Sequence, residues 1–236
     1  MPDSRLNPIC SGTGPRRVDV LNPNSTEACT RSMADGVAPL AEALGLSVYC
    51  HTLLDGPPGV ESQADIADVA HPIASWCRDY ASASNALVIA CFSDPALDLA
   101  RESVSTPVFG IAECAIKAAC IRADRFGLIA IKQASVLRQR KYVRRMGLLD
   151  RFAGGGTVGL SVPELADAER TRARMIEVGN DLVRRQGADV LIMGCAGMAA
   201  HRATLEAETG VPVSEPTQAA VVMAAGLSAL PGWNNG

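Results

Sequence analysis

The sequence predicts an α/β protein made of two similar halves, each built around a parallel β-sheet. Strand and helix patterns alternate along the chain, which is typical of parallel sheets with covering helices. One strand in each half is continuously apolar, as expected for a strand buried on both faces. Four landmarks recur in the same order in each half: a first strand, this buried strand, a cysteine at its end and a proline-containing strand. Such a repeat is typical of a duplicated half-domain, so we expect a pseudo-twofold axis to relate the halves.

The first half opens with a short strand and a helix. Residues 17–21 (RVDVL) form the strand. Asn24 is expected to cap the following helix, with Glu27 three residues later completing a capping box. The helix is expected to run to Leu44 and to end at Gly45, because glycine commonly follows the last helical residue.

A second helix and a buried strand complete the first half. Apolar residues recur at helical spacing over 66–80, with Pro72 as an expected kink. The apolar run 86–90 (ALVIA) is then predicted as a buried strand, and it ends at Cys91. A Thr-Pro-Val segment follows at residues 106–108.

The second half repeats this order. Its predicted elements are a strand at 126–131, a helix at 135–146 closed by Gly147, a helix at 165–185 closed by Gly187, and a buried strand at 190–194. That strand ends at Cys195, and a Val-Pro-Val segment follows at 211–213. Pro107 comes 16 residues after Cys91, and Pro212 comes 17 residues after Cys195.

Cys91 and Cys195 are the candidate catalytic residues. Both lie at the carboxyl end of a buried strand, where ligands bind in open parallel sheets. Small, loop-forming residues follow each cysteine, and we expect free backbone amides there to lower the thiol pKa values. If the halves face each other, the pseudo-twofold axis places one thiol on each side of a single cleft.

Two opposed thiols suit racemisation at a carbon next to a carbonyl group. The reaction needs a base on one face of the carbon and an acid on the other, and two identical groups can exchange these roles. A thiol with an ordinary pKa of about 8.5 can serve as either. Backbone amides in the loops can hold the negative oxygen of the carbanion, as in an oxyanion hole. We therefore expect no metal and no other cofactor.

The remaining cysteines indicate no further site. The chain has eight cysteines and three histidines, and no cysteine pair has CxxC spacing, so a structural zinc site is not expected. The other six cysteines do not share the strand-end placement. Cys114 and Cys120 are expected to lie in one helix, with their side chains in the hydrophobic core. A single cysteine at a strand end is more often a packing residue, and it is the matched pair that favours catalysis.

Composition excludes several classes of function. The net charge is −3 and the pI is near 5.7, which argues against a nucleic-acid partner. The basic segment 138–145 is expected to be a helix with one solvated face. No apolar run is long enough to span a bilayer, and residues 1–17 lack the apolar core of a signal peptide. We therefore expect a cytoplasmic protein that binds a small molecule, with residues 1–15 as a flexible extension.

Four segments together resemble the aspartate/glutamate racemase superfamily, and within it the hydantoin (allantoin) racemase branch. They are residues 21–26 (LNPNST), 90–95 (ACFSDP), 108–113 (VFGIAE) and 193–198 (MGCAGM). The resemblance implies two Rossmann-like lobes with parallel sheets and the active site in the cleft between them. It implies a first lobe of residues 16–113 with a returning C-terminal helix at 216–232, a second lobe of 114–215, and a homo-oligomer.

The same resemblance implies which residues act. Cys91 and Cys195 match the catalytic pair. The residues expected to bind substrate are Asn22, Pro23, Asn24, Phe92, Ser93, Ser135, Ala196 and Gly197. Turn and cap chemistry explains the two asparagines equally well, and the two interpretations are compatible.

Two segments depart from the family pattern, and both bear on the substrate. Where hydantoin racemases commonly carry paired threonines, this chain has residues 131–135 (IKQAS), and Ser135 can take a hydroxyl role. Lys132 either favours an anionic substrate or, as we expect, is solvated at a strand edge. Glu215 lies in a segment that replaces the aspartate-glycine pair of many relatives.

Three functions compete. The first is a racemase acting on 5-substituted hydantoins or a related ureide or amino-acid derivative. The second is an isomerase or decarboxylase of the same superfamily, such as a maleate isomerase or an arylmalonate decarboxylase. The third is a two-lobed small-molecule-binding protein without catalysis. A nucleotide site is not expected, because the glycines at 154–156 are predicted to follow a helix rather than a strand.

Overall fold

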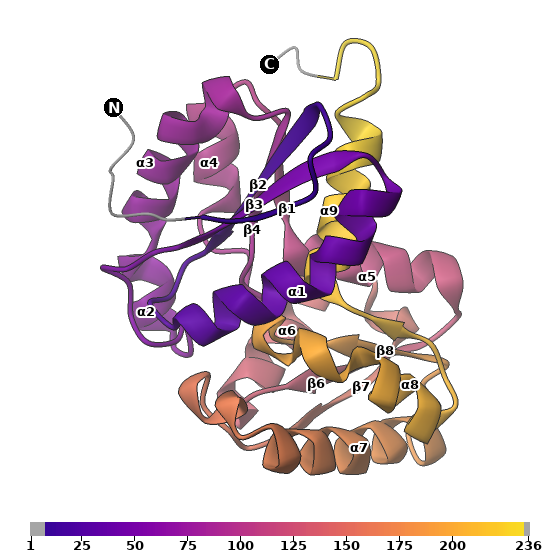
Figure 1. The fold of residues 1–236 in the computed structure, drawn as a ribbon. Coiled ribbons are helices and arrows are strands. Elements are labelled where there is room, and N and C mark those ends of the chain that lie inside the picture. The colour runs from indigo at the N-terminus through magenta and orange to yellow at the C-terminus, as the bar shows by residue number, and fades with distance from the viewer. Residues whose placement is uncertain (1–7, 234–236) are drawn as a thin grey trace.

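A computed structural model describes residues 8–233, which form two β-sheets with helices packed against them (Figure 1). The first sheet has five strands in the order β1 (Ile9–Ser11), β3 (Leu46–Thr52), β2 (Arg16–Asn22), β4 (Ala86–Ile89) and β5 (Val108–Gly110). The second has four in the order β7 (Phe152–Thr157), β6 (Phe126–Ala130), β8 (Val190–Met193) and β9 (Val213–Ser214). All neighbouring strands are parallel except the pair β1 and β3.

The two sheets share one strand order. The order β3-β2-β4-β5 of the first sheet matches the order β7-β6-β8-β9 of the second. Strand β4 therefore corresponds to β8, and every residue of both strands is buried. The α/β fold class with parallel sheets is confirmed. The residue boundaries of the two lobes stay a prediction.

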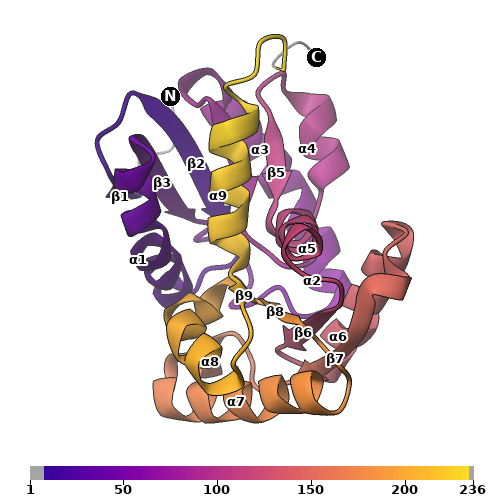
Figure 2. The same ribbon diagram turned by 90° about the vertical axis from the view of Figure 1, so that its right-hand side faces the viewer.

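Helices cover both faces of each sheet. They are α1 (Glu27–Ala43), α2 (Gln63–Asp68), α3 (Ala70–Tyr80), α4 (Leu97–Ser103), α5 (Ile111–Arg122), α6 (Gln133–Arg145), α7 (Ala168–Arg184), α8 (Arg202–Thr209) and α9 (Pro216–Leu227). Helices α1 and α9 share a hydrophobic core with one face of the first sheet, and α3 and α4 cover its other face. Figure 2 shows α9 returning from the second sheet to lie between α1 and α5.

Helix starts account for three wrong predictions. Helix α1 begins at Glu27 after Thr26, and Asn24 does not cap it, because its side-chain oxygen accepts the Thr26 amide (2.9 Å) in a turn before the helix. Residues 63–80 form two helices instead of one kinked helix. Pro72 lies in the first turn of α3, where a missing amide proton costs no hydrogen bond.

The long helix of the second half also begins later than expected. Residues 163–166 form a short 3₁₀ segment, and α7 starts at Ala168 with the Asp167 carboxylate accepting the Arg170 amide (3.1 Å). The glycine run at 154–156 is part of strand β7 and does not follow a helix end directly. A Cβ at Gly156 would lie 2.5 Å from Val178 of α7, so glycine lets the helix pack closely on this strand.

Two further expectations need correction at the chain start and in α5. The predicted flexible extension contains strand β1, which pairs with β3; residues 1–7 lie outside the described part of the chain. Cys114 is buried as expected, whereas Cys120 is only partly buried. Among the described residues, no helix is both long and apolar enough to cross a membrane.

Candidate active site

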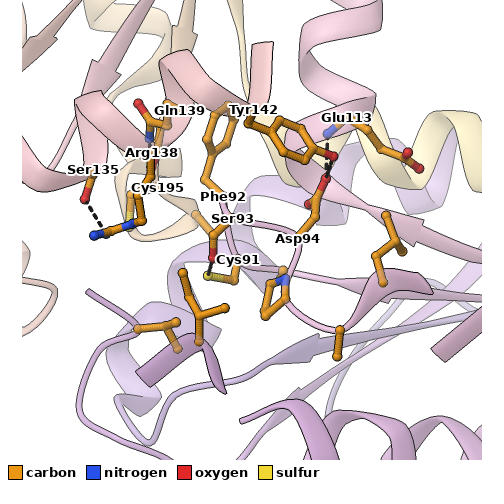
Figure 3. A pocket seen from close by; sticks show the side chains of 18 of the residues that line it. Cys91, Phe92, Ser93, Asp94, Glu113, Ser135, Arg138, Gln139, Tyr142 and Cys195 are labelled. Atoms are coloured by element: carbon orange, nitrogen blue, oxygen red, sulfur yellow. Dashed lines mark hydrogen bonds between the residues drawn. The ribbon is translucent and has the colours of Figure 1, made fainter. Parts of the chain in front are cut away.

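A cavity of about 530 Å³ opens at the carboxyl ends of β4, β6 and β8. Cys91 and Cys195 both line it, together with residues from α1, α4 and α6 (Figure 3). The volume is within the usual range for a small-molecule site. The structure thus brings the two matched cysteines to one cavity, as the repeat predicts.

The loop after Cys91 is strained and held by hydrogen bonds. Asp94 and Ala96 have positive φ angles of 44° and 55°, which non-glycine residues rarely adopt. The Cys91 Sγ lies 3.2 Å from the Ser93 Oγ, and the Ser93 amide also bonds the thiol. The turn in the loop brings the Ser93 amide back toward the sulfur at the end of the strand.

Asp94 ties this loop to two other elements. Its carboxylate accepts the amides of Ala112 (2.9 Å) and Glu113 (2.8 Å) at the start of α5, and the Tyr142 hydroxyl of α6 donates to it (2.7 Å). A Cβ at Gly110 would lie 2.3 Å from this carboxyl group, so the contact requires glycine there. Burial raises the pKa of Asp94 to about 6, although the three hydrogen bonds oppose the rise. Asp94 therefore positions the loop that carries Cys91.

The loop after Cys195 is a short 3₁₀ helix, Ala196–His201, packed against α1. The Gly197 amide bonds the Cys195 thiol, as the Ser93 amide bonds Cys91. A Cβ at Gly197 would lie 3.8 Å from the Cys195 Sγ and 3.5 Å from the Sγ of Cys29 on α1. Cys29, which the sequence analysis did not single out, lines the same cavity.

Burial outweighs the amides in setting the thiol pKa values. It raises the pKa of Cys91, while the Ser93 hydrogen bonds and the Arg138 charge oppose the rise. It raises the pKa of Cys195 well above the ordinary value; the neighbouring Cys29 adds to the rise and the Gly197 amide opposes it. The expectation of lowered pKa values is therefore wrong, because desolvation penalises each thiolate more than its neighbouring donors stabilise it.

Helix α6 presents a polar stripe to the cavity, made of Ser135, Arg138, Gln139 and Tyr142. Their spacing of three to four residues places them on one helix face. The basic segment 138–145 is therefore only partly the solvated face that its composition predicts. The i, i+3, i+4, i+7 spacing of polar side chains, beginning at the predicted Ser135, is the signal that could have revealed Arg138 and Tyr142.

The predicted substrate-binding residues separate into two groups. Those that line the cavity are Asn24, Phe92, Ser93, Ser135 and Ala196. Asn22, Pro23 and Gly197 do not line it.

Two residues of the second group support the site from behind. The buried Asn22 donates to the side-chain oxygens of Asn24 (3.1 Å) and Thr30 (3.0 Å), because its side chain turns toward α1. Gly197 contacts the Cys195 thiol through its amide.

Lys132 and Glu215 have structural partners. Lys132 forms an ion pair with Glu61, whose other carboxylate oxygen accepts the Val162 amide (2.6 Å). The Lys132 side chain is 44% exposed and does not line the cavity, which agrees with a solvated lysine, and the structure adds its ion pair with Glu61. Glu215 is buried and caps α9, accepting the amides of Thr217 (3.1 Å) and Gln218 (2.6 Å).

Comparison with known proteins agrees with this fold. The model of the Asp/Glu/hydantoin racemase family matches residues 18–224. The hydantoin racemase of Paenarthrobacter aurescens is 33% identical over 217 residues, which cover 91% of this chain and 92% of the relative. The crystal structure of allantoin racemase from Pseudomonas fluorescens superposes with a TM-score of 0.84 at 24% identity, covering 89% and 90% of the two chains. Allantoin racemase from Klebsiella pneumoniae gives 0.82 at 29% identity, covering 93% and 92%.

The α/β fold and these relatives define an isomerase of the racemase type. The chain belongs to the Asp/Glu/hydantoin racemase family. Among residues 8–233, no group of three or more His, Cys, Asp or Glu side chains is arranged to hold a metal ion.

Proposed function

We propose that this enzyme is a cofactor-independent racemase that moves one proton between the faces of a carbon, with Cys91 and Cys195 as the two acid–base groups. The observation that carries the proposal is their placement: both thiols lie at the ends of equivalent strands and line one cavity. The proposed substrates are 5-substituted hydantoins or a related ureide or amino-acid derivative, as for the named relatives.

The mechanism follows from the two faces of the cavity. One cysteine, as thiolate, removes the proton from the stereocentre, and the electron pair moves onto the adjacent carbonyl oxygen. The other cysteine, as thiol, returns a proton to the opposite face, so that the two thiols exchange protonation states. The raised pKa values keep the acid protonated and make the base strong once formed. Backbone amides of the two cysteine loops can hold the negative oxygen, as in an oxyanion hole.

Alternative functions fit less well. A decarboxylase that keeps only the second-half cysteine has no use for a thiol at Cys91, yet this thiol lies in the cavity with its own hydrogen-bond partners. A binding protein without catalysis has no need for two matched thiols at equivalent strand ends.

The direct test is proton exchange on single enantiomers. Benzylhydantoin, allantoin, aspartate and glutamate are each incubated with the enzyme in D₂O. Loss of optical rotation together with deuterium at the stereocentre of a hydantoin or ureide is the expected result. Rotation lost without deuterium, or no reaction with any hydantoin or ureide, contradicts the proposal.

Three further parts of the proposal concern cofactors, assembly and location. Activity should survive exhaustive chelation and dialysis, since both proton-transfer groups are side chains; loss with EDTA and recovery with zinc would refute this. A homo-oligomer is expected in light scattering. A cytoplasmic location agrees with the eight free thiols, because a reducing compartment keeps thiols unpaired.

A further inference from the structure

Arg138 is a cation of the cavity wall that has no carboxylate partner among the described residues. One guanidinium nitrogen donates to the Glu61 backbone carbonyl (2.6 Å) and to the Ser135 hydroxyl (3.1 Å). Both acceptors are neutral, and the charge of Arg138 also lowers the pKa of the Asp65 carboxyl, with which Arg138 forms no salt bridge. The side chain is half-buried, and burying a charge without a counter-ion is costly.

The other charges around the cavity differ from Arg138. Arg101 pairs with Glu113 (2.5 Å), and Lys132, near the same face, pairs with Glu61. Lys141 and Arg145 are exposed. The Asp94 carboxylate is already occupied by three hydrogen bonds. Arg138 is thus the cation of the described wall that is half-buried and forms no salt bridge.

Arg138 also lies near the reacting groups. Its charge acts on the Cys91 thiol and lowers the pKa of that thiol against the effect of burial. Figure 3 shows its side chain on the same wall of the cavity as Ser135. A substrate whose stereocentre lies between the two cysteines can therefore extend a side chain to Arg138.

We infer that Arg138 determines specificity by binding an anionic side chain of the substrate, so that the preferred substrates are hydantoins with a carboxyalkyl group at C5. This inference rests on the proposed racemase function and adds the substrate class. A guanidinium fixed by two neutral acceptors keeps its remaining N–H groups for a carboxylate, which it can bind in a bidentate manner. The substrate carboxylate would supply the salt-bridge partner that Arg138 does not have among the described residues.

The test compares two substrates of nearly equal size and shape. 5-(2-carboxyethyl)hydantoin carries the anion, and 5-(2-carbamoylethyl)hydantoin replaces it with a neutral amide. The measured quantity is the ratio of kcat/KM for the acid to kcat/KM for the amide. Because both substrates use the same thiols, any effect of Arg138 on the pKa of Cys91 cancels in this ratio.

The wild-type enzyme should favour the acid, and Arg138→Gln should lower the ratio by roughly 10- to 100-fold, as expected for loss of a charged hydrogen bond. Arg138→Lys keeps the charge but not the planar fork, so it should lower the ratio less. The matched control is Arg140→Gln, which removes an exposed arginine of the same helix outside the cavity and should leave the ratio unchanged. Turnover of the amide substrate by each variant shows that it is folded.

Other outcomes overturn the inference. If the wild-type enzyme has the same kcat/KM for both substrates, Arg138 does not bind an anionic side chain of the substrate. If Arg138→Gln slows both substrates by the same factor, the arginine acts on the reacting centre instead. If the wild-type enzyme racemises benzylhydantoin or allantoin but neither of these two hydantoins, the inference about Arg138 fails while the proposed racemase function stands.

Discussion

The loops after Cys91 and Cys195 occupy equivalent positions at the ends of β4 and β8, yet they are held in different ways. The first loop is fixed by Asp94, whose carboxylate reaches the start of α5 and the hydroxyl of Tyr142. The second is a 3₁₀ helix packed against α1. In the second half, helix α9 corresponds to α5. The amides at its start donate to the carboxylate of Glu215, which directly precedes the helix.

This difference shows that the repeat determines where the thiols lie, but not how readily they ionise. Burial raises the pKa of both thiols. For Cys91, three neighbours lower the pKa against this effect: the hydroxyl and the amide of Ser93 and the charge of Arg138. Cys195 has the Gly197 amide, and its neighbour Cys29 raises its pKa further. Two groups that exchange roles in a symmetric reaction are therefore electrostatically unequal.

The largest expected effect comes from removing either thiol. Cys91→Ser and Cys195→Ser should each lower racemisation by at least about 10³-fold, because serine is too weak an acid or base at neutral pH. Each variant should keep slow deuterium wash-in from D₂O on one enantiomer only, with opposite preferences. Equal loss of exchange on both enantiomers would show that the thiols act as one unit. Intact racemisation in Cys91→Ser would favour a one-cysteine mechanism.

Removing the hydrogen bonds that hold the loop after Cys91 should slow proton exchange on one face of the substrate stereocentre. Asp94→Asn leaves fewer acceptor sites for the α5 amides, and Tyr142→Phe removes the hydroxyl that donates to Asp94. Both should lower kcat by roughly 10-fold, since displacement of a catalytic group is costly. Exchange on the enantiomer deprotonated by Cys91 should fall more than exchange on the other. An equal fall on both enantiomers would show that Asp94 supports the whole cavity.

The unequal thiols should also differ in chemical reactivity. At pH 8, iodoacetamide should alkylate Cys91 several-fold faster than Cys195, because a thiol with a less raised pKa forms more thiolate. Both rates, and racemisation itself, should rise with pH, since each pKa is shifted upward from its ordinary value. Peptide mapping by mass spectrometry separates the two sites from the exposed Cys10. Faster labelling of Cys195 would contradict the order of the two pKa values.

The smallest effect on catalysis is expected for Glu215, the counterpart of Asp94 in the second half. Glu215→Gln should change kcat less than about twofold, because this carboxylate caps α9 and does not line the cavity. If Glu215→Gln lowered kcat as strongly as Asp94→Asn, the two carboxylates would not differ in their effect on catalysis, and this prediction would be wrong.

Glu215 should act on stability instead. Burial raises the pKa of this carboxyl from 4.5 to about 7, so the unfolded chain releases the proton at lower pH than the folded protein. The resulting stabilisation is complete below pH 4.5 and is lost as the pH rises to about 7. The wild-type free energy of unfolding should fall over this range by up to about 3 kcal/mol relative to Glu215→Gln. Urea unfolding at pH 4.5 and pH 7 measures this, and parallel pH dependences would refute it.

The sequence alone determined the features that depend on local pattern. The sequence predicted the alternation of strands and helices and the buried strands that end at Cys91 and Cys195. It also predicted the glycines that end α1, α6 and α7. These features were predictable because the spacing of apolar residues and the positive φ angles of glycine are set within a few residues of the chain. The repeat then placed the two thiols at equivalent strand ends of the two sheets. Helix starts were less accurate, because capping depends on side-chain partners such as those that hold Asn24.

Only the tertiary structure decided what surrounds the thiols. Arg138 and Tyr142 belong to a basic amphipathic helix, and nothing local says whether their face meets water or a cavity. Cys29 reaches Cys195 from α1, more than 160 residues away in sequence. The thiol pKa values follow from the same cause. Burial is a property of the packed molecule, and it outweighed the backbone amides that the sequence correctly placed beside each sulfur.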